Sequence, residues 1–261
     1  MKTYKKAHKM NYKHPVTFFS LFALGIVAAT PAAHAISNIK SPFAEEGEIE
    51  AEYKGEWHHD DNKSNKNAQE HVLGLGYGFA PKWFAEGEFE FAREAGESMD
   101  LEKIELELKH QFTDHGDYWW DVGALAYYKY GVDSDTKDQV EGWLLLQNTY
   151  RHFTTRVNVE LEHTLGQDGG DIDLETRAFT RYNLSAALKP AIEWHANYND
   201  IDHIRNTEHY IGPAAYGHLT FLEELIAGDG EFEYELAYLF GITDAASDGA
   251  VRWKLEYKTH F

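Results

Sequence analysis

Carboxylates recur at every second residue in several stretches of this chain, and that spacing limits the chemistry they can do. The stretch GEIEAEYKGEW (47–57) places Glu48, Glu50, Glu52 and Glu56 on one phase and mainly apolar or aromatic residues on the other. A period of two predicts a β-strand with one charged face and one apolar face. Such a row of glutamates can form cross-strand ion pairs or line an aqueous passage that favours cations. The choice depends on which solvent each face meets.

The same alternation recurs to the end of the chain and predicts twelve strands. We expect them at 47–57, 71–79, 83–93, 103–112, 120–130, 140–151, 156–163, 172–182, 188–198, 210–219, 231–240 and 251–261. The sixth is less regular, because Trp143 and Leu145 occupy the phase that is charged elsewhere. The tenth is the weakest, because Pro213 lacks a backbone donor and the following TFLEELIAGDG favours a helical start.

Two patterns indicate that the apolar phase meets lipid. Aromatic residues gather near the ends of the predicted strands, as in the aromatic belts of membrane proteins. The connections FAPKWF and RHFTTR are tight, whereas others, such as DDNKSNKNAQE and NDIDHIRNTEH, are longer and polar. Short turns on one rim and long loops on the other are typical of outer-membrane barrels. The sequence therefore predicts an all-β protein, a transmembrane antiparallel up-and-down β-barrel of twelve strands.

The N-terminal region predicts export. Five lysines without acidic residues precede the apolar run VTFFSLFALGIVAA and the small-residue site Ala33-His34-Ala35. This order predicts a signal peptide over 1–35, cleaved after Ala35. A leader (36–46) and the barrel (47–261) follow. The chain has no cysteine, so disulfides cannot stabilise the fold.

The last predicted strand resembles the C-terminal assembly signal of Gram-negative outer-membrane proteins. Val251, Trp253, Leu255 and Tyr257 share one phase that ends at Phe261. We assign the signal to Tyr257 and Phe261. The resemblance implies a porin-like barrel in the outer membrane that meets periplasmic chaperones, the barrel assembly machinery and outer-membrane lipid. It does not identify a particular porin family.

The inward phase supplies the candidate functional residues. Buried charges are costly unless they are paired, so the interior must hold water, dense ion pairs, or both. The acidic candidates for the pore lining are Glu50, Glu52, Glu86, Glu88, Glu90, Glu105, Glu107, Glu233 and Glu235. The basic candidates are Arg151, Arg156, Arg177, Arg181 and Lys189, on the sixth to ninth strands near the short-turn rim.

These residues predict an outer-membrane channel that passes small hydrophilic or cationic solutes through a narrow, net-acidic lumen. Opposed acidic and basic walls would set a field across that lumen and orient dipolar solutes. The chain holds 24 basic and 44 acidic residues, which makes nucleic acid an unsuitable partner. No cofactor and no metal are expected. Gly74, Gly76 and Gly78 share one face of the second strand, which could leave lumen space or accept a plug.

Three alternatives remain open at this stage. An enzyme within the barrel is one, although no serine shares a strand face with a histidine, so we expect no enzyme. A plugged barrel acting in surface or metal binding is another, with WHHDD (57–61) and NDIDHIRNTEH (199–209) as candidate ligand clusters. A soluble ligand-binding barrel is the third, because periodicity alone does not say which face points inward.

Overall fold

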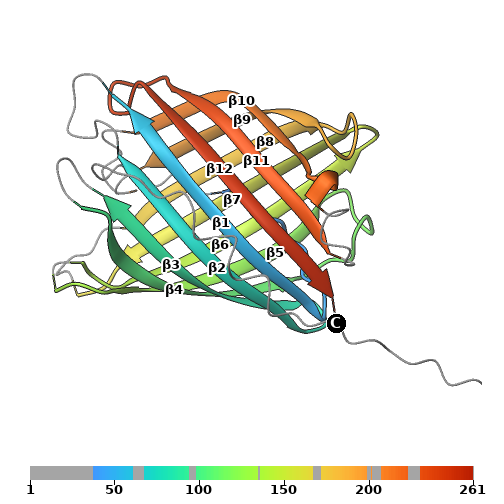
Figure 1. The fold of residues 1–261 in the computed structure, drawn as a ribbon, viewed down its shortest axis with the longest axis horizontal. Helices are drawn as coiled ribbons and strands as arrows, with labels where there is room; N and C mark the ends of the chain where they lie inside the picture. The colour runs from blue at the N-terminus through green and yellow to red at the C-terminus, as the bar shows by residue number, and fades with distance from the viewer. Residues whose placement is uncertain are drawn as a thin grey trace, which may run out of the picture.

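Twelve antiparallel strands close into a single barrel in the computed structural model (Figure 1). The structure describes residues 38–60, 68–93, 98–134, 136–166, 172–198, 201, 207–222 and 230–260. The strands are β1 (Glu48–His59), β2 (Gln69–Ala80), β3 (Trp83–Arg93), β4 (Asp100–Gln111), β5 (Asp121–Gly131), β6 (Gln139–Tyr150), β7 (Phe153–Thr164), β8 (Ile172–Tyr182), β9 (Lys189–Tyr198), β10 (Glu208–His218), β11 (Glu231–Gly241) and β12 (Gly249–His260).

The barrel confirms the predicted fold, and each strand lies within a few residues of its predicted range. Neighbours in sequence pair with each other, and β1 pairs with β12 to close the sheet. Apolar side chains such as Leu75 and Ile192 point outward and are 64% and 63% exposed. Glutamates of the other phase, such as Glu52 and Glu88, are buried inside. The apolar phase is therefore the outer surface, which excludes a soluble barrel with an apolar core.

The irregular phase of β6 has a local explanation. Trp143 and Leu145 point inward and form a small buried apolar cluster with Leu125 and Tyr127 of β5. The Arg177 guanidinium lies 4.4 Å from the centre of the Trp143 ring, a cation–π contact that packs this base against the cluster.

The two rims differ less in loop length than the sequence predicts. β1 begins and β12 ends at the same rim (Figure 1). This rim holds the two-residue turns 81–82 and 151–152, in which Lys82 and Arg151 have φ values of 67° and 57°. It also holds the longer connections 112–120, 183–188 and 219–230. We call it the short-turn rim and the opposite one the long-loop rim.

Side-chain hydrogen bonds hold the 112–120 connection at the short-turn rim. In 112–120, the Thr113 hydroxyl accepts a hydrogen bond from Val122 N–H (2.8 Å), and the Asp121 carboxylate accepts one from Gly116 N–H (2.8 Å). The predicted helical start after β10 is helical at 220–222, where the described residues before 230 end. Within the described ranges, no helix is long and apolar enough to cross a membrane.

Aromatic rings pair on the outer surface near both rims. Near the short-turn rim, the Phe153 and Tyr182 rings lie 5.2 Å apart and those of Trp119 and Tyr150 lie 5.8 Å apart. Near the long-loop rim, the Tyr238 and Phe240 rings lie 4.8 Å apart. These outward aromatic pairs fit the interfacial belts that the sequence predicts.

Candidate functional site

The N-terminal leader does not lie outside the barrel but enters it. Residues 38–46, which we call the lumen segment, include buried Asn38, Ile39, Lys40 and Ala44. The segment leads to Gly47, whose N–H donates to Gly78 O at the short-turn rim (2.7 Å).

Four inward side chains from well-separated strands hold the lumen segment. Asn158 of β7 accepts a hydrogen bond from Lys40 N–H (2.7 Å) and donates one to Lys40 O (3.0 Å). Arg156 donates to Ile39 O (2.9 Å), and Gln111 accepts from Ala44 N–H (3.0 Å). Arg252 of β12 donates to the Asn38 side chain. The contacts of Asn158, Arg156 and Gln111 satisfy backbone groups of the segment that would otherwise be buried without partners.

Two glycines on the barrel wall make room for the segment. A Cβ atom at Gly78 would lie 1.7 Å from Glu45 O, and one at Gly123 would lie 2.7 Å from Pro42 O. Neither position tolerates a side chain while the segment occupies the lumen. The open question about the glycine face of β2 is therefore answered at Gly78, which accepts the incoming segment.

Lys40 places one ammonium within a group of four buried carboxylates. Its Nζ lies 2.9 Å from Glu107, 3.2 Å from Glu86, 3.3 Å from Glu88 and 3.9 Å from Glu52. Burial alone would lower the pKa of Lys40, but the surrounding carboxylates outweigh it and hold this pKa well above its ordinary value. Lys40 is therefore a counter-ion that the lumen segment supplies to the acidic wall.

The remaining acidic candidates all point inward and are paired across strands. Lys254 contacts Glu52 (2.8 Å) and Glu50 (3.8 Å), and Lys54 bridges Glu52 and Glu88 at 2.6 and 2.7 Å. The other pairs are Lys103–Glu90 (3.1 Å), Lys129–Glu105 (3.6 Å), Lys258–Glu233 (3.4 Å) and Arg252–Glu235 (2.7 Å). Dense ion pairing therefore accounts for much of the buried charge.

The basic candidates divide into three groups, and two of these lie inside the barrel. Arg177 is buried between Glu160 (2.6 Å) and Glu175. Arg156, Arg181 and Lys189 line a cavity of about 270 Å³ between the lumen segment and the wall formed by β7 to β12 and β1.

Arg151 corrects the sequence prediction, because it does not line the lumen. It occupies the exposed two-residue turn 151–152, where the turn's left-handed backbone directs its guanidinium over the outward Tyr150 ring (5.1 Å). A residue in a tight turn lies beyond the strand alternation that assigns the other four residues to the lumen.

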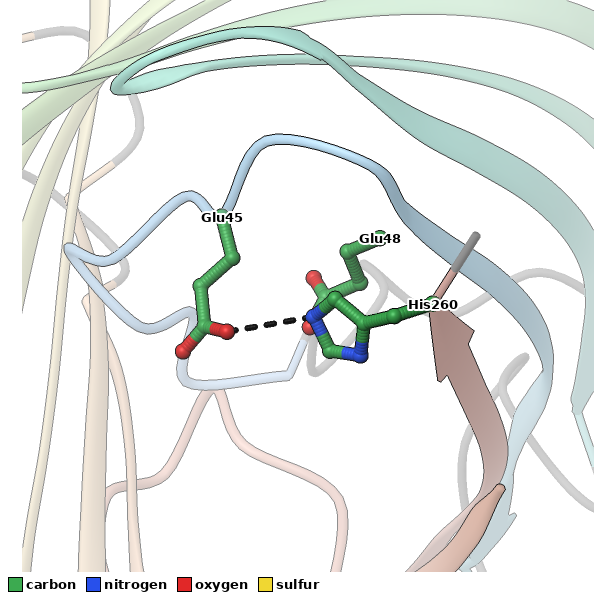
Figure 2. Close-up of side chains that lie close together, drawn as sticks. All are labelled: Glu45, Glu48 and His260. Atoms are coloured by element: carbon green, nitrogen blue, oxygen red, sulfur yellow. Dashed lines mark hydrogen bonds and ion pairs between the residues drawn. The ribbon is translucent and has the colours of Figure 1, made fainter. Parts of the chain in front are cut away.

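The lumen segment is fastened where it leaves the barrel. Figure 2 shows Glu45, Glu48 and His260 at the short-turn rim, where His260 Nε2 lies 3.1 Å from a Glu45 carboxylate oxygen. The Tyr257 ring of the predicted assembly signal lies 4.7 Å from the Phe232 ring of β11. Phe261, the other residue of that signal, lies outside the described residues.

A serine, a histidine and a glutamate meet near the long-loop rim, which sequence reasoning missed. Ser247 Oγ lies 2.9 Å from His58 Nδ1, and His58 Nε2 lies 3.0 Å from Glu56 Oε1. The Tyr210 hydroxyl also accepts a hydrogen bond from Ser247 N–H (3.0 Å). Ser247 and His58 are fully buried, so a substrate carbonyl cannot reach the hydroxyl in this arrangement. Because Ser247 and His58 are 189 residues apart in sequence, no local motif predicts that they meet.

Metal-ligand geometry occurs at other places than the predicted loop clusters. Within the described parts of the chain, two groups that contain histidine bring their ligand atoms within 4.8 Å: Glu45, Glu48 and His260, and His218, Glu231 and Glu233. Both lie at the short-turn rim. The predicted clusters at 57–61 and 199–209 lie partly outside the described residues.

The segment anchors also escaped the sequence analysis, although each left a small signal. Asn158 is an uncharged residue in the inward phase of RVNVELEH, and Lys40 is the sole base between Ile36 and Glu46. Neither signal identifies the residue that the side chain contacts.

Comparisons with known proteins agree with this architecture. A NanC porin structure has a TM-score of 0.54 and 12% identity, over 81% of this chain and 100% of that chain. The COG4313 outer membrane channel from Pseudomonas putida F1 has a TM-score of 0.59 and 12% identity, over 87% of this chain and 100% of that chain. At this identity the likeness concerns the fold, which is that of porin-like outer-membrane barrels. No curated protein sequence matches the chain.

One family of sequences matches most of the barrel. Residues 43–206 match the family described as "Protein of unknown function, DUF481". The matched range begins within the lumen segment and includes β1 to β9. Because it covers more than half of the chain, the protein belongs to the DUF481 family.

Proposed function

We propose that the protein is an outer-membrane channel for small hydrophilic solutes, narrowed by its own lumen segment. The observation that carries this proposal is the charged cavity of about 270 Å³ beside that segment, inside a barrel of porin-like fold. A twelve-strand barrel is wider than the eight-strand barrels that side chains fill, so a chain segment and a passage fit together in it. The chemistry proposed is passage rather than catalysis.

The proposal includes a location and a direction of selectivity. The predicted signal peptide, the resemblance of the last strand to an assembly signal and the outer aromatic belts support the outer membrane of a Gram-negative bacterium. Glutamates outnumber bases among the inward residues, which supports preferential passage of cations and cationic solutes. Outer-membrane lipid, periplasmic chaperones and the barrel assembly machinery are the partners that this location requires.

Planar-bilayer recording tests the proposal directly. The chain from Ile36 onward would be refolded and compared with a variant that lacks residues 36–44 but keeps the turn into β1. We expect small conductance steps for the complete chain and at least severalfold larger steps for the deletion, because its lumen is wider. Heat-modifiable gel migration would establish that both barrels are folded. Two folded but silent proteins would contradict the proposal.

A further inference from the structure

The cavity beside the lumen segment has an excess of unpaired positive charge on one wall. Arg156 of β7, Arg181 of β8 and Lys189 of β9, here called the basic cluster, all line it. Over the described ranges, no carboxylate oxygen lies within 4.0 Å of a side-chain nitrogen of these residues, whereas Arg177 and Arg252 each contact two carboxylates. The basic cluster thus differs from the paired bases elsewhere in the barrel.

Three acidic residues that line the same cavity have basic partners outside the cluster. Glu235 lies 2.7 Å from Arg252, Glu233 lies 3.4 Å from Lys258, and Glu256 lies 3.1 Å from Lys258. These carboxylates therefore lie against other bases, and the wall that carries the basic cluster is positive although the lumen as a whole is acidic. A solute with a negative group therefore meets, on this wall, three neighbouring bases that have no carboxylate partner among the described residues.

The donors in the cluster are arranged for a bound group. The Arg156 and Arg181 guanidinium carbons lie 5.2 and 5.4 Å from the centre of the buried Phe179 ring, which orients both side chains. Arg156 donates two hydrogen bonds to the Gln147 side-chain oxygen (2.9 and 2.8 Å) and one to Ile39 O (2.9 Å). Among the described residues, buried Arg181 Nε has no hydrogen-bond partner. Arg181 and Lys189 therefore have charged groups without carboxylate partners in the described chain, whereas Arg156 contributes its positive charge but already donates its hydrogen bonds to protein atoms.

We propose that the basic cluster binds the carboxylate or phosphate group of a small solute that enters from the short-turn rim. Arg181 would donate paired hydrogen bonds to two oxygens of that group, and Lys189 would contribute a point charge. The cavity volume suits a small metabolite rather than an oligomer. This inference rests on the proposed channel function, for which it supplies the chemical class of one solute group.

Calorimetric titration of the refolded chain in detergent micelles tests this site without any measurement of current. Succinate and inorganic phosphate are the probes, and choline is the cationic control. We expect saturable binding of succinate or phosphate that weakens as salt rises, and the tighter probe identifies the group. The double variant Arg181→Gln/Lys189→Gln should lose at least tenfold in affinity. The single variant Lys189→Gln should lose affinity to a smaller extent, and its half-buried side chain makes it safe for folding.

Arg151→Gln is the matched control, because it removes one positive charge from the same rim outside the cavity. It should leave the affinity unchanged. Absence of binding by both anions, or equal affinity in the double variant and the Arg151→Gln protein, would overturn the inference. If the protein binds an anion in micelles but carries no current in bilayers, the anion site is supported and the channel function is contradicted. If it carries current but binds neither anion, the channel function is supported and the anion site is contradicted.

Discussion

The Asn158 side chain holds the backbone of Lys40 from both sides, because its amide accepts Lys40 N–H at 2.7 Å and donates to Lys40 O at 3.0 Å. One side chain thereby reproduces the pair of hydrogen bonds that a neighbouring strand would make. Since Asn158 is almost fully buried, this contact fixes the lumen segment at a place that water does not reach readily.

Asn158→Ala should loosen the lumen segment while the barrel stays folded. The substitution leaves a buried donor and a buried acceptor without partners, which costs about 2 kcal/mol of unfolding free energy. Denaturant titration in micelles measures that cost, and bilayer recording should show larger or more frequent openings. Asn148→Ala is the control, because Asn148 contacts the exposed 112–120 connection instead. If the two variants conduct equally, the Asn158 contact does not control how far the lumen is open.

Gly78→Ala should displace the lumen segment at its exit. The new Cβ would meet Glu45 O at 1.7 Å, a backbone atom that can move only if the segment moves. Limited trypsin digestion of proteoliposomes should then cleave after Lys40 much faster than in the parent protein. Gly87→Ala is matched in chemistry but has no atom within 4 Å of its new Cβ, so its digestion should be unchanged. Slow digestion of both variants would contradict the proposed fit at Gly78.

Lys40→Met should destabilise the barrel at neutral pH. Removal of the ammonium leaves Glu52, Glu86, Glu88 and Glu107 without one counter-ion, and breaking a buried ion pair costs about 3–5 kcal/mol. The second substitution Glu107→Gln should restore part of the loss, because it removes the carboxylate closest to the missing charge. If the single variant unfolds at the same denaturant concentration as the parent, Lys40 is not the counter-ion of this wall.

The raised pKa of Lys40 also sets the sign of a pH effect. A lysine whose pKa is higher in the folded state contributes stability that is complete below its unfolded pKa of about 10.4, and loses it as pH rises through the folded value. The stability difference between the parent and Lys40→Met should therefore be present at pH 9 and shrink only under strongly alkaline conditions. A difference that disappears between pH 7 and pH 9 would contradict this assignment.

Ser247→Ala distinguishes a structural network from a catalytic one. We expect a loss of about 1 kcal/mol in stability, because the hydroxyl contacts His58 and Tyr210 inside the barrel. Background hydrolysis of a short p-nitrophenyl ester should be the same for both proteins. A parent protein that hydrolyses the ester and loses this activity with Ser247→Ala would instead establish a barrel enzyme.

The strands were predictable because each carries its own periodic signal. The ranges of 83–93 and 172–182 agree at both ends with β3 and β8, and the phase of the glutamates correctly gave the buried face. The lumen segment was not predictable in the same way. Its backbone has no strand period, and its contacts to Asn158 and Arg252 join residues 118 and 214 positions apart.

The candidate site shows the same division between local and distant signals. Alternation placed Arg156, Arg181 and Lys189 on the inner face, but it does not reveal which bases have carboxylate partners. That depends on the register of strands far apart in sequence, such as β12 supplying Arg252 to Glu193 of β9 (2.6 Å). Arg151 was misplaced because a tight turn interrupts the alternation at its position.

The path of the lumen segment constrains the order in which the barrel is assembled. Asn38 contacts the last strand, while the same segment leads directly into the first strand, and these two strands form the closing seam. The segment must therefore reach the interior before β1 and β12 complete their pairing, or thread through a rim afterwards. With cleavage predicted after Ala35, only Ile36 and Ser37 precede Asn38. Cleavage after Ala35, which the sequence predicts, would give the segment a short free end, and the entry of that end into the lumen is coupled to the closing of the seam between β1 and β12.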